Sequence, residues 1–183
     1  VKKTRSASMV AGFDLLGNEV GWPADLFRPA FDLARDAGKR VKVHAGEMSG
    51  PENIQTAVEK LGITQIGHGT SAIQNPDVVA LLRERNVTIE MCPTSNERLQ
   101  NIASYQDHPI FAFDRAGVSV SVNSDDPTFL GLNLTDELLR LMVERKATIY
   151  DIKCWNRNAF LQAILDEDTR KRFIKELEEW NSF

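Results

Sequence analysis

The feature that most limits the fold of this chain is a strand–loop–helix pattern that recurs along its first two thirds. Short runs rich in Val, Ile and Thr, or followed at once by Gly or Pro, have the composition of β-strands. The segments between them are typical of helices, because they begin at or near a proline and end at Gly or Asn. The predicted strands lie in SMVAGFDL (8–15), VKVHAGE (41–47), TQIGHGT (64–70), VTIEMCP (87–93) and VSVSVNSDD (118–126). The predicted helices are Phe27–Ala37, Pro51–Leu61, Pro76–Arg85 and Pro109–Ala116.

Strands that alternate with helices through short loops predict a parallel sheet with right-handed crossovers. Two architectures fit this pattern, an open doubly wound sheet and a (β/α) barrel. In each run the reactive residues come at the carboxyl end of the strand, which is where TIM barrels place their catalytic groups. No G-x-G-x-x-G motif follows any run, which weakens the nucleotide-binding doubly wound alternative. The reactive strand-end residues are Asp14, His44, His68, Cys92, Asp125 and Asp126.

A complete barrel has eight such units and about 250 residues. This chain has 183 residues and is therefore too short to form one by itself. We therefore predict an α/β fold that is the C-terminal portion of a TIM-type (β/α)8 barrel, about five βα units, with the remaining strands expected upstream of Val1. Residues 1–183 are expected to form one incomplete domain, with residues 134–183 as a helical tail packed on the barrel. The tail helices are predicted over Thr135–Lys146, from Thr148 or Asp151 onward, and over Asp166–Trp180.

Composition narrows the classes of partner. The formal net charge is -4 and the sequence pI is about 5.4, so no basic surface is expected to bind nucleic acid or an anionic membrane. No stretch approaches the roughly 18 apolar residues of a membrane span. Cys92 and Cys154 are too few for a disulfide framework and lack zinc-finger spacing, which favours a reducing, cytoplasmic location. A small-molecule substrate is the class that remains.

His44 and Glu47 stand three residues apart at the end of one predicted strand. If the chain leaves the strand at Ala45 and Gly46, both side chains can turn into the mouth of a barrel. Imidazole binds metals and a carboxyl group transfers protons, so this pair fits a catalytic site. The alternative is a structural histidine and a glutamate at the start of the following helix.

The adjacent carboxylates Asp125 and Asp126 are the sharpest local signal. Two like charges at one strand end are costly to desolvate together unless a metal or a ligand compensates, and a carboxylate with imidazoles suits zinc. The alternative is an Asp-Asp-Pro turn at the start of a helix. His68, between two glycines, could equally be a hydrogen-bonded structural residue.

Three further residues are candidates for either a structural or a functional role. Cys92 could be a thiolate ligand or nucleophile, but a cysteine at a strand end before proline is more typical of buried packing. His108 precedes a helix start and is interpreted as structural. Gly17 lies in a polar loop, where its backbone amide could reach a ligand.

In this order and at these spacings, FDLLGNE, VKVHAGE, IGHGT, MCPTSN and VNSDDP resemble the motifs of the adenosine deaminase family of zinc-dependent aminohydrolases. The resemblance runs from Met9 to Gly131 and more loosely through the tail. It implies a (β/α) barrel in which these motifs belong to the fourth to eighth strands. It also implies that His44 and Asp125 are zinc ligands beside the two histidines of an H-x-H motif. The three histidines of this chain include no such motif, so those two ligands are expected upstream of Val1.

The implied reaction is hydrolytic deamination at C6 of a purine, which converts adenosine to inosine and ammonia. Bound zinc supplies a water of lowered pKa for this chemistry. The resemblance implies that Asp125 also orients the attacking hydroxide and that His68 helps to hold it. Glu47 is implied to protonate purine N1, which requires a pKa raised by burial. Asp126 is implied to bind N7, and the amide of Gly17 to bind N3.

Two alternatives to adenosine deamination stay open. The motifs do not separate adenosine deaminases from adenine deaminases, which yield hypoxanthine. A different class of hypothesis is a catalytically inert partial barrel, because five strands curved for a barrel leave two open edges. Such edges are covered if another chain supplies the missing barrel half or if copies of this chain associate.

Overall fold

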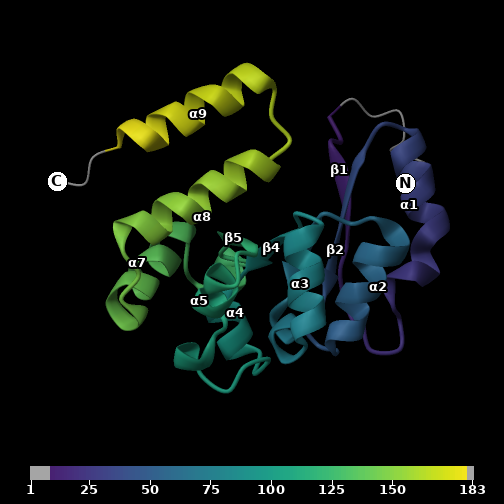
Figure 1. The fold of residues 1–183 in the computed structure, drawn as a ribbon, viewed down its shortest axis with the longest axis horizontal. Helices are drawn as coiled ribbons and strands as arrows, with labels where there is room; N and C mark the ends of the chain where they lie inside the picture. The colour runs from purple at the N-terminus through teal and green to yellow at the C-terminus, as the bar shows by residue number, and fades with distance from the viewer. Residues whose placement is uncertain (1–8, 181–183) are drawn as a thin grey trace.

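The fold is that of a computed structural model, which describes residues 9–180 (Figure 1). Five parallel strands form one sheet in the order β1-β2-β3-β4-β5, so the predicted α/β architecture is confirmed. Ser8, the first residue of the first predicted run, lies outside the described residues. The strands are β1 Gly12–Leu15, β2 Arg40–Ala45, β3 Gln65–His68, β4 Thr88–Met91 and β5 Ser119–Val122.

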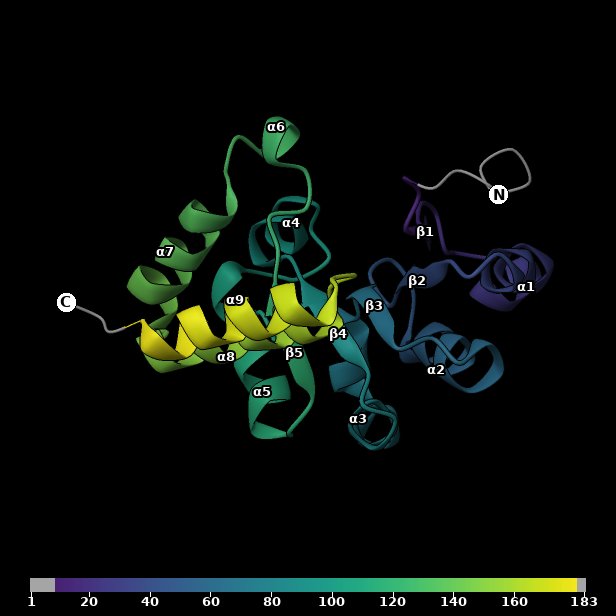
Figure 2. The same cartoon turned by 90° about the horizontal axis from the view of Figure 1, so that it is seen from above.

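Consecutive strands are neighbours and their order never reverses, which is the connectivity of a (β/α) barrel. Figure 2 shows the strands following an arc, with α1, α2, α3 and α5 along one side of it. The sheet is therefore a partial barrel, with β1 and β5 as its two edge strands.

The two faces of the sheet differ in chemistry. The register places Val43 beside Ile66 and Ile66 beside Ile89, and these side chains belong to the buried core under the helices. Because side chains alternate between faces along a strand, the neighbouring residues Lys42, His44 and Glu90 point to the other face. The polar face of the arc is thus the side that carries the reactive groups.

The helices follow the predicted ones closely. Pro51–Leu61 is a helix over those residues and ends at Gly62 in the left-handed conformation, while the other three predicted bounds are correct to within one residue at each end. The α-helices are α1 Arg28–Asp36, α2 Pro51–Leu61, α3 Pro76–Glu84, α4 Pro93–Arg98, α5 Ile110–Arg115, α6 Pro127–Leu130, α7 Leu134–Arg145, α8 Ile149–Gln162 and α9 Glu167–Glu179. Short 3₁₀ helices lie at Ala24–Phe27, Thr70–Gln74 and Tyr105–Asp107.

Two short helices, α4 and α6, are not among the predicted helices, although α6 follows the Asp-Asp-Pro turn that was the alternative interpretation of Asp125 and Asp126. Both begin at a proline directly after a strand-end motif, Pro93 and Pro127. The residues of α4 are mostly polar and those of α6 are few, so neither helix shows an apolar periodicity in the sequence. Their presence matters because α4 carries Ser95 and Asn96 to the site.

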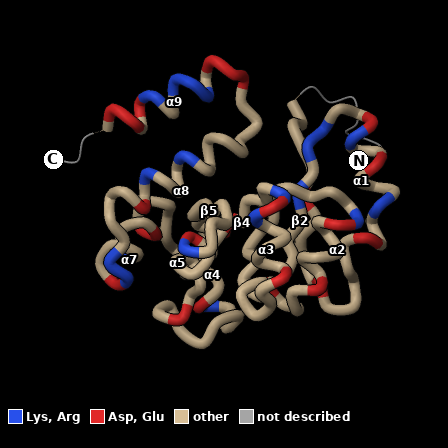
Figure 3. Tube along the Cα trace, in the orientation of Figure 1, with Lys and Arg blue, Asp and Glu red and all other residues tan. Residues whose placement is uncertain are grey.

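The tail helices begin where capping chemistry predicts. Thr148 and Asp151 form a capping box at the start of α8, and Asp166 caps α9. α8 packs on β5 and α9 packs on α8. Figure 3 shows acidic and basic residues interleaved along α9, and its spacing supports exposed ion pairs such as Lys171 with Glu167.

Within residues 9–180, no helix combines the length and the apolar character that crossing a membrane requires.

Candidate active site

The loop after β2 is built around the buried carboxylate of Glu19, which is 8% exposed. The chain leaves the strand at Gly46, whose φ of 70° is a left-handed conformation that glycine adopts without strain. The turn aims successive backbone amides at one point, where Glu19 accepts hydrogen bonds from Gly46, Glu47, Met48 and Ser49 at 2.8, 2.7, 2.6 and 3.2 Å. This loop therefore holds Glu47 in place through its own backbone.

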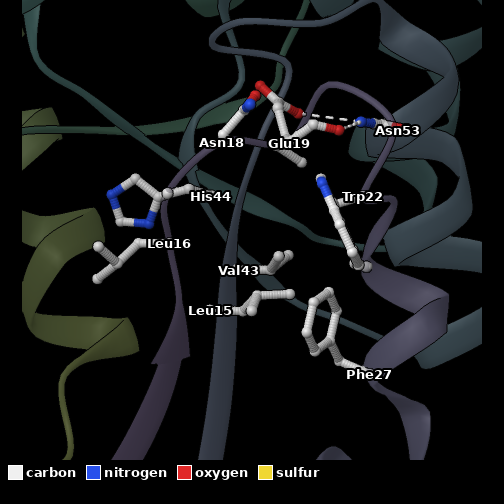
Figure 4. A pocket seen from close by; sticks show the side chains of 12 residues that line it. Leu15, Leu16, Asn18, Glu19, Trp22, Phe27, Val43, His44 and Asn53 are labelled. Carbon is white, nitrogen blue, oxygen red and sulfur yellow. Dashed lines mark hydrogen bonds between the residues drawn. The ribbon is translucent and has the colours of Figure 1, made fainter.

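Two side chains complete the cradle around Glu19. The Ser49 hydroxyl donates to Oε2 at 2.6 Å and the Asn53 amide donates to the same oxygen at 3.2 Å, as Figure 4 shows for Asn53. Burial acts to raise the pKa of Glu19, but the hydrogen bonds from Ser49, Met48 and Gly46 outweigh it and the pKa is lowered. Glu19 is thus an ionised anchor for the loop.

His44 projects from the polar face of β2 into space that a glycine leaves free. Its strand partner is Gly67, where a Cβ would lie 2.9 Å from the His44 ring. The His44 Nδ1 is 3.2 Å from Asp14 Oδ1, and Lys42 also contacts Asp14 at 3.3 Å. Burial opposes protonation of His44, but the hydrogen bond and charge of Asp14 raise its pKa. With Nδ1 engaged by a carboxylate, Nε2 is the nitrogen that a metal would take.

Glu47 and His68 meet across the ends of two strands. The Glu47 Oε2 lies 3.3 Å from His68 Nε2, and Asn101 donates to Glu47 Oε1 at 3.1 Å. Burial, together with the nearby charge of Asp125, raises the pKa of Glu47. This is the direction expected of a carboxyl group that must carry a proton to its substrate.

His68 is buried, with 2% of its surface exposed, and lies in the left-handed region at φ 60°. Burial, followed by the neighbouring His44 ring at 5.0 Å, lowers the pKa of His68 to about 4. Its Nδ1 is 3.0 Å from the Asn96 side-chain nitrogen. His68 is therefore a neutral imidazole with both nitrogens engaged.

Asp125 and Asp126 do not share a desolvated site in this structure, which corrects the sequence-based expectation. Both residues are exposed in the described part of the chain, where they follow β5, and α6 begins directly after them at Pro127. Asp125, at φ 58°, accepts a hydrogen bond from the Ser95 hydroxyl at 2.6 Å. Asp126 is the N-cap residue of α6, yet its carboxylate makes no capping hydrogen bond there.

One group of potential metal ligands lies close together. Single donor atoms of His68, Cys92 and Asp125 are within 4.8 Å of one another. Cys92 is buried as expected, and burial raises the pKa of its thiol well above the usual value, so it stays protonated at neutral pH. Imidazole and carboxylate are donors that zinc accepts. His44, the predicted ligand, is not one of these three.

The predicted site residues line neighbouring pockets and not a single one. His44, Asp125 and Asp126 share a pocket of about 480 Å³. Gly17 lies with His44 in a second pocket of about 250 Å³, where Trp22 and Phe27 form the apolar wall seen in Figure 4. Glu47 lines a third. His44 and Leu16 line both of the first two pockets.

Four residues at this end of the sheet escaped the sequence analysis as functional groups. Glu19 stands in the quoted FDLLGNE motif and Ser95 and Asn96 in MCPTSN, so motif membership was the available signal. Asn101 reaches Glu47 from 54 residues away in sequence, and no local pattern marks it.

The fold and this end of the sheet define a class: a (β/α) barrel protein with imidazoles, carboxylates and a glutamate of raised pKa at the carboxyl ends of its strands. A profile of the family described as adenosine deaminase matches residues 1–180. The chain belongs to the adenosine deaminase family.

Curated relatives and solved structures agree with this assignment. The chain is 39% identical over 162 residues to adenosine deaminase of Serratia proteamaculans and 38% identical to that of Yersinia enterocolitica, covering 88% of this chain and 49% of each relative. The crystal structure of adenine deaminase from Arthrobacter aurescens superimposes with a TM-score of 0.90 at 30% identity, covering 93% of this chain and 52% of that one. An amidohydrolase from Burkhoderia ambifaria, solved with bound zinc, gives a TM-score of 0.87 at 29% identity, covering 96% of this chain and 50% of that one. The chain thus spans about half the length of the relatives it matches.

Proposed function

We propose that this chain provides one part of the active site of a zinc-dependent purine deaminase, which hydrolyses the C6 amino group of adenosine to give inosine and ammonia. The observation that carries the proposal is the pairing of Glu47, whose pKa is raised, with the neutral His68 at 3.3 Å. The remaining imidazole ligands, an H-x-H pair, would come from a part of the barrel outside this chain. Family membership supports the reaction class.

His44 and Asp125 are the residues we assign to the metal. They line the same pocket, and the Asp14 contact leaves the Nε2 of His44 available. Bound zinc would supply the activation of water for attack on the ring. His68 and Cys92, which approach Asp125, form the wall beside this position.

The chain's own residues divide the remaining work. Glu47, whose pKa is raised by burial, would donate a proton to purine N1 and so make C6 electrophilic. His68 would donate a hydrogen bond toward the attacking oxygen. Asp126, exposed at the pocket, would bind N7, and the backbone amide of Gly17 would bind N3. Asp125 would also orient the attacking water.

Adenine is the second candidate substrate, because an adenine deaminase is among the structures with high similarity. We prefer adenosine, since the curated relatives named adenosine deaminase are 38% and 39% identical. A third outcome is an inert partial barrel, supported by open edges at β1 and β5 and by coverage of about half of each relative. The single-domain organisation and a cytoplasmic location belong to the same proposal, the latter because both cysteines are free.

The test is ammonia release from adenosine and from adenine, measured beside zinc stoichiometry and size-exclusion mass. In the intact barrel, which would supply the remaining zinc ligands, Glu47→Gln should retain zinc and lose turnover by about 10²–10⁴-fold, because only proton delivery is removed. Asp125→Ala should lose both zinc and activity. Asp126→Ala is the matched control, in which zinc stays bound while substrate affinity falls.

Three results would overturn parts of the proposal. Surviving activity in Glu47→Gln removes the proton-donor role, and stoichiometric zinc in Asp125→Ala removes the ligand role. A monomer with substoichiometric zinc and no turnover of either purine establishes the inert-barrel alternative.

A further inference from the structure

A chain of contacts runs from the backbone of α5 to the proposed catalytic glutamate. The Ile110 amide lies 3.3 Å from His108 Nδ1, and His108 Nε2 lies 3.2 Å from Asn96 Oδ1. The Asn96 Nδ2 lies 3.0 Å from His68 Nδ1. These three contacts are hydrogen bonds, and the last step is a close contact of 3.3 Å between His68 Nε2 and Glu47 Oε2. The chain of contacts therefore connects α5 and α4 to the end of β3 and the loop after β2.

The first link sets the direction of the others. A backbone N–H can only donate, so the His108 Nδ1 that receives it carries no proton. The proton of His108 must then be on Nε2, from which it is donated to Asn96 Oδ1. This contact fixes the orientation of the Asn96 amide group: its oxygen, Oδ1, faces His108, and its nitrogen, Nδ2, faces His68.

The amide group of Asn96 transmits this direction to His68. Because Nδ2 of Asn96 is a donor, the Nδ1 of His68 must accept, and the His68 proton is on Nε2. We propose that Asn96 and His108 are positioning residues that fix His68 in the tautomer with its proton on Nε2, so that His68 presents a hydrogen-bond donor to the active site. The tautomer follows from the contacts alone, while its use at the substrate rests on the proposed function.

Burial prevents water from substituting for these partners. Asn96, His108 and His68 are 0%, 1% and 2% exposed. The opposite tautomer of His68 would set its Nδ1–H against the N–H of Asn96, leaving two buried donors facing each other. Burial, with the charge of Arg145, lowers the pKa of His108 to about 3, so the start of the chain is neutral.

The sequence analysis interpreted His108 as structural, and its burial agrees with that interpretation. The hydrogen bonds add a second role, because an apolar residue of similar size would fill the same space without orienting Asn96. Asn96 lies on α4, so this short helix connects the motif that contains Cys92 to the histidine of the preceding strand end.

The test is two-bond nitrogen–proton NMR of the full chain labelled with ¹⁵N-histidine, with a chelator present to exclude metal. The three histidines make the ring signals assignable. We expect a protonated Nε2 and an unprotonated Nδ1 for both His68 and His108. A protonated Nδ1 on His68 in the unmodified protein would overturn the proposal without any variant.

Substitutions then identify which residue sets the tautomer. Asn96→Asp replaces the donor with a second acceptor, so Nδ1 of His68 should acquire a proton and its signal should move to the protonated position. His108→Leu should leave the amide of Asn96 free to rotate, and the two nitrogen signals of His68 should become averaged. Asn101→Ala, which removes the hydrogen bond from Asn101 to Glu47, is the control and should leave the His68 signals in place.

The outcomes separate this inference from the proposed function. An unchanged His68 pattern in Asn96→Asp overturns the role of Asn96, and an unchanged pattern in His108→Leu overturns that of His108, whether or not the protein deaminates purines. If the expected pattern is found and neither adenosine nor adenine is deaminated, the positioning chain stands and the proposed reaction fails.

Discussion

The loops after β2 and β5 both turn at a left-handed residue, Gly46 at φ 70° and Asp125 at φ 58°, but they are held very differently. The first surrounds the buried carboxylate of Glu19 with four backbone amides. The second is exposed, and Asp125 has the Ser95 hydroxyl as its hydrogen-bond donor.

This difference indicates that the chain holds the proposed proton donor more firmly than the proposed metal and substrate ligands. Glu47, the proposed proton donor, is held by the hydrogen bond of its backbone amide to Glu19 and by the hydrogen bond from Asn101. The carboxylates of the β5 loop retain access to solvent. A preorganised proton donor beside an exposed metal and substrate loop is the arrangement we infer.

The largest expected effect is on packing beneath the β2 loop. Gly46→Ala adds a Cβ that overlaps Ile54 and lies 2.5 Å from the Ser71 hydroxyl, besides straining φ. We expect it to lower the free energy of unfolding by about 3 kcal/mol or more. Gly131→Ala, at φ 64° with open space around the added atom, should cost about 1 kcal/mol. Equal losses in chemical denaturation would remove the proposed difference between the loops.

Next in size is the loss of the Glu19 charge. Glu19→Gln replaces an oxygen acceptor with an amide nitrogen that faces backbone donors, and should lower the free energy of unfolding by about 2–3 kcal/mol. Asp126→Asn removes a charge from the exposed β5 loop and should change it by less than about 0.5 kcal/mol. Comparable effects in urea unfolding would contradict the role of Glu19 as an anchor.

The effect of Glu19→Gln on the free energy of unfolding is also expected to depend on pH. The folded-state pKa of Glu19 lies below its ordinary value of 4.5, so its stabilising contribution is complete above that value and is lost as pH falls through the lowered pKa. The difference in unfolding free energy between wild type and Glu19→Gln should therefore be constant near neutrality and shrink in acid. A difference that grows on acidification would show that the carboxylate is not stabilised by its hydrogen bonds.

The smallest effect concerns the β5 loop. Ser95→Ala removes the hydroxyl that donates to Asp125 at 2.6 Å, and should cost about 0.5–1.5 kcal/mol because the carboxylate can turn to water. Ser124→Ala, beside Asp125 but outside this hydrogen bond, is the control. A loss as large as that of Glu19→Gln would mean that the β5 loop is anchored as firmly as the β2 loop.

The sequence was most informative where local rules act. Pro51 and Gly62 bound a helix because proline fits its first turn and glycine its left-handed end, and the family motifs marked the strand ends. It was least informative about contacts between distant segments. Glu19 and Asn101 act through partners that only the fold brings near, and no local pattern marks the exposure of Asp125.

Amide hydrogen exchange tests the contrast between the loops most directly. With metal removed, the amides of Glu47, Met48 and Ser49 should exchange slowly, because they donate to a buried carboxylate, while those of residues 124–126 should exchange quickly. Glu19→Gln should accelerate exchange in the β2 loop alone. Equally fast exchange in both loops of the unmodified protein would contradict the claim that this chain preorganises its proton donor.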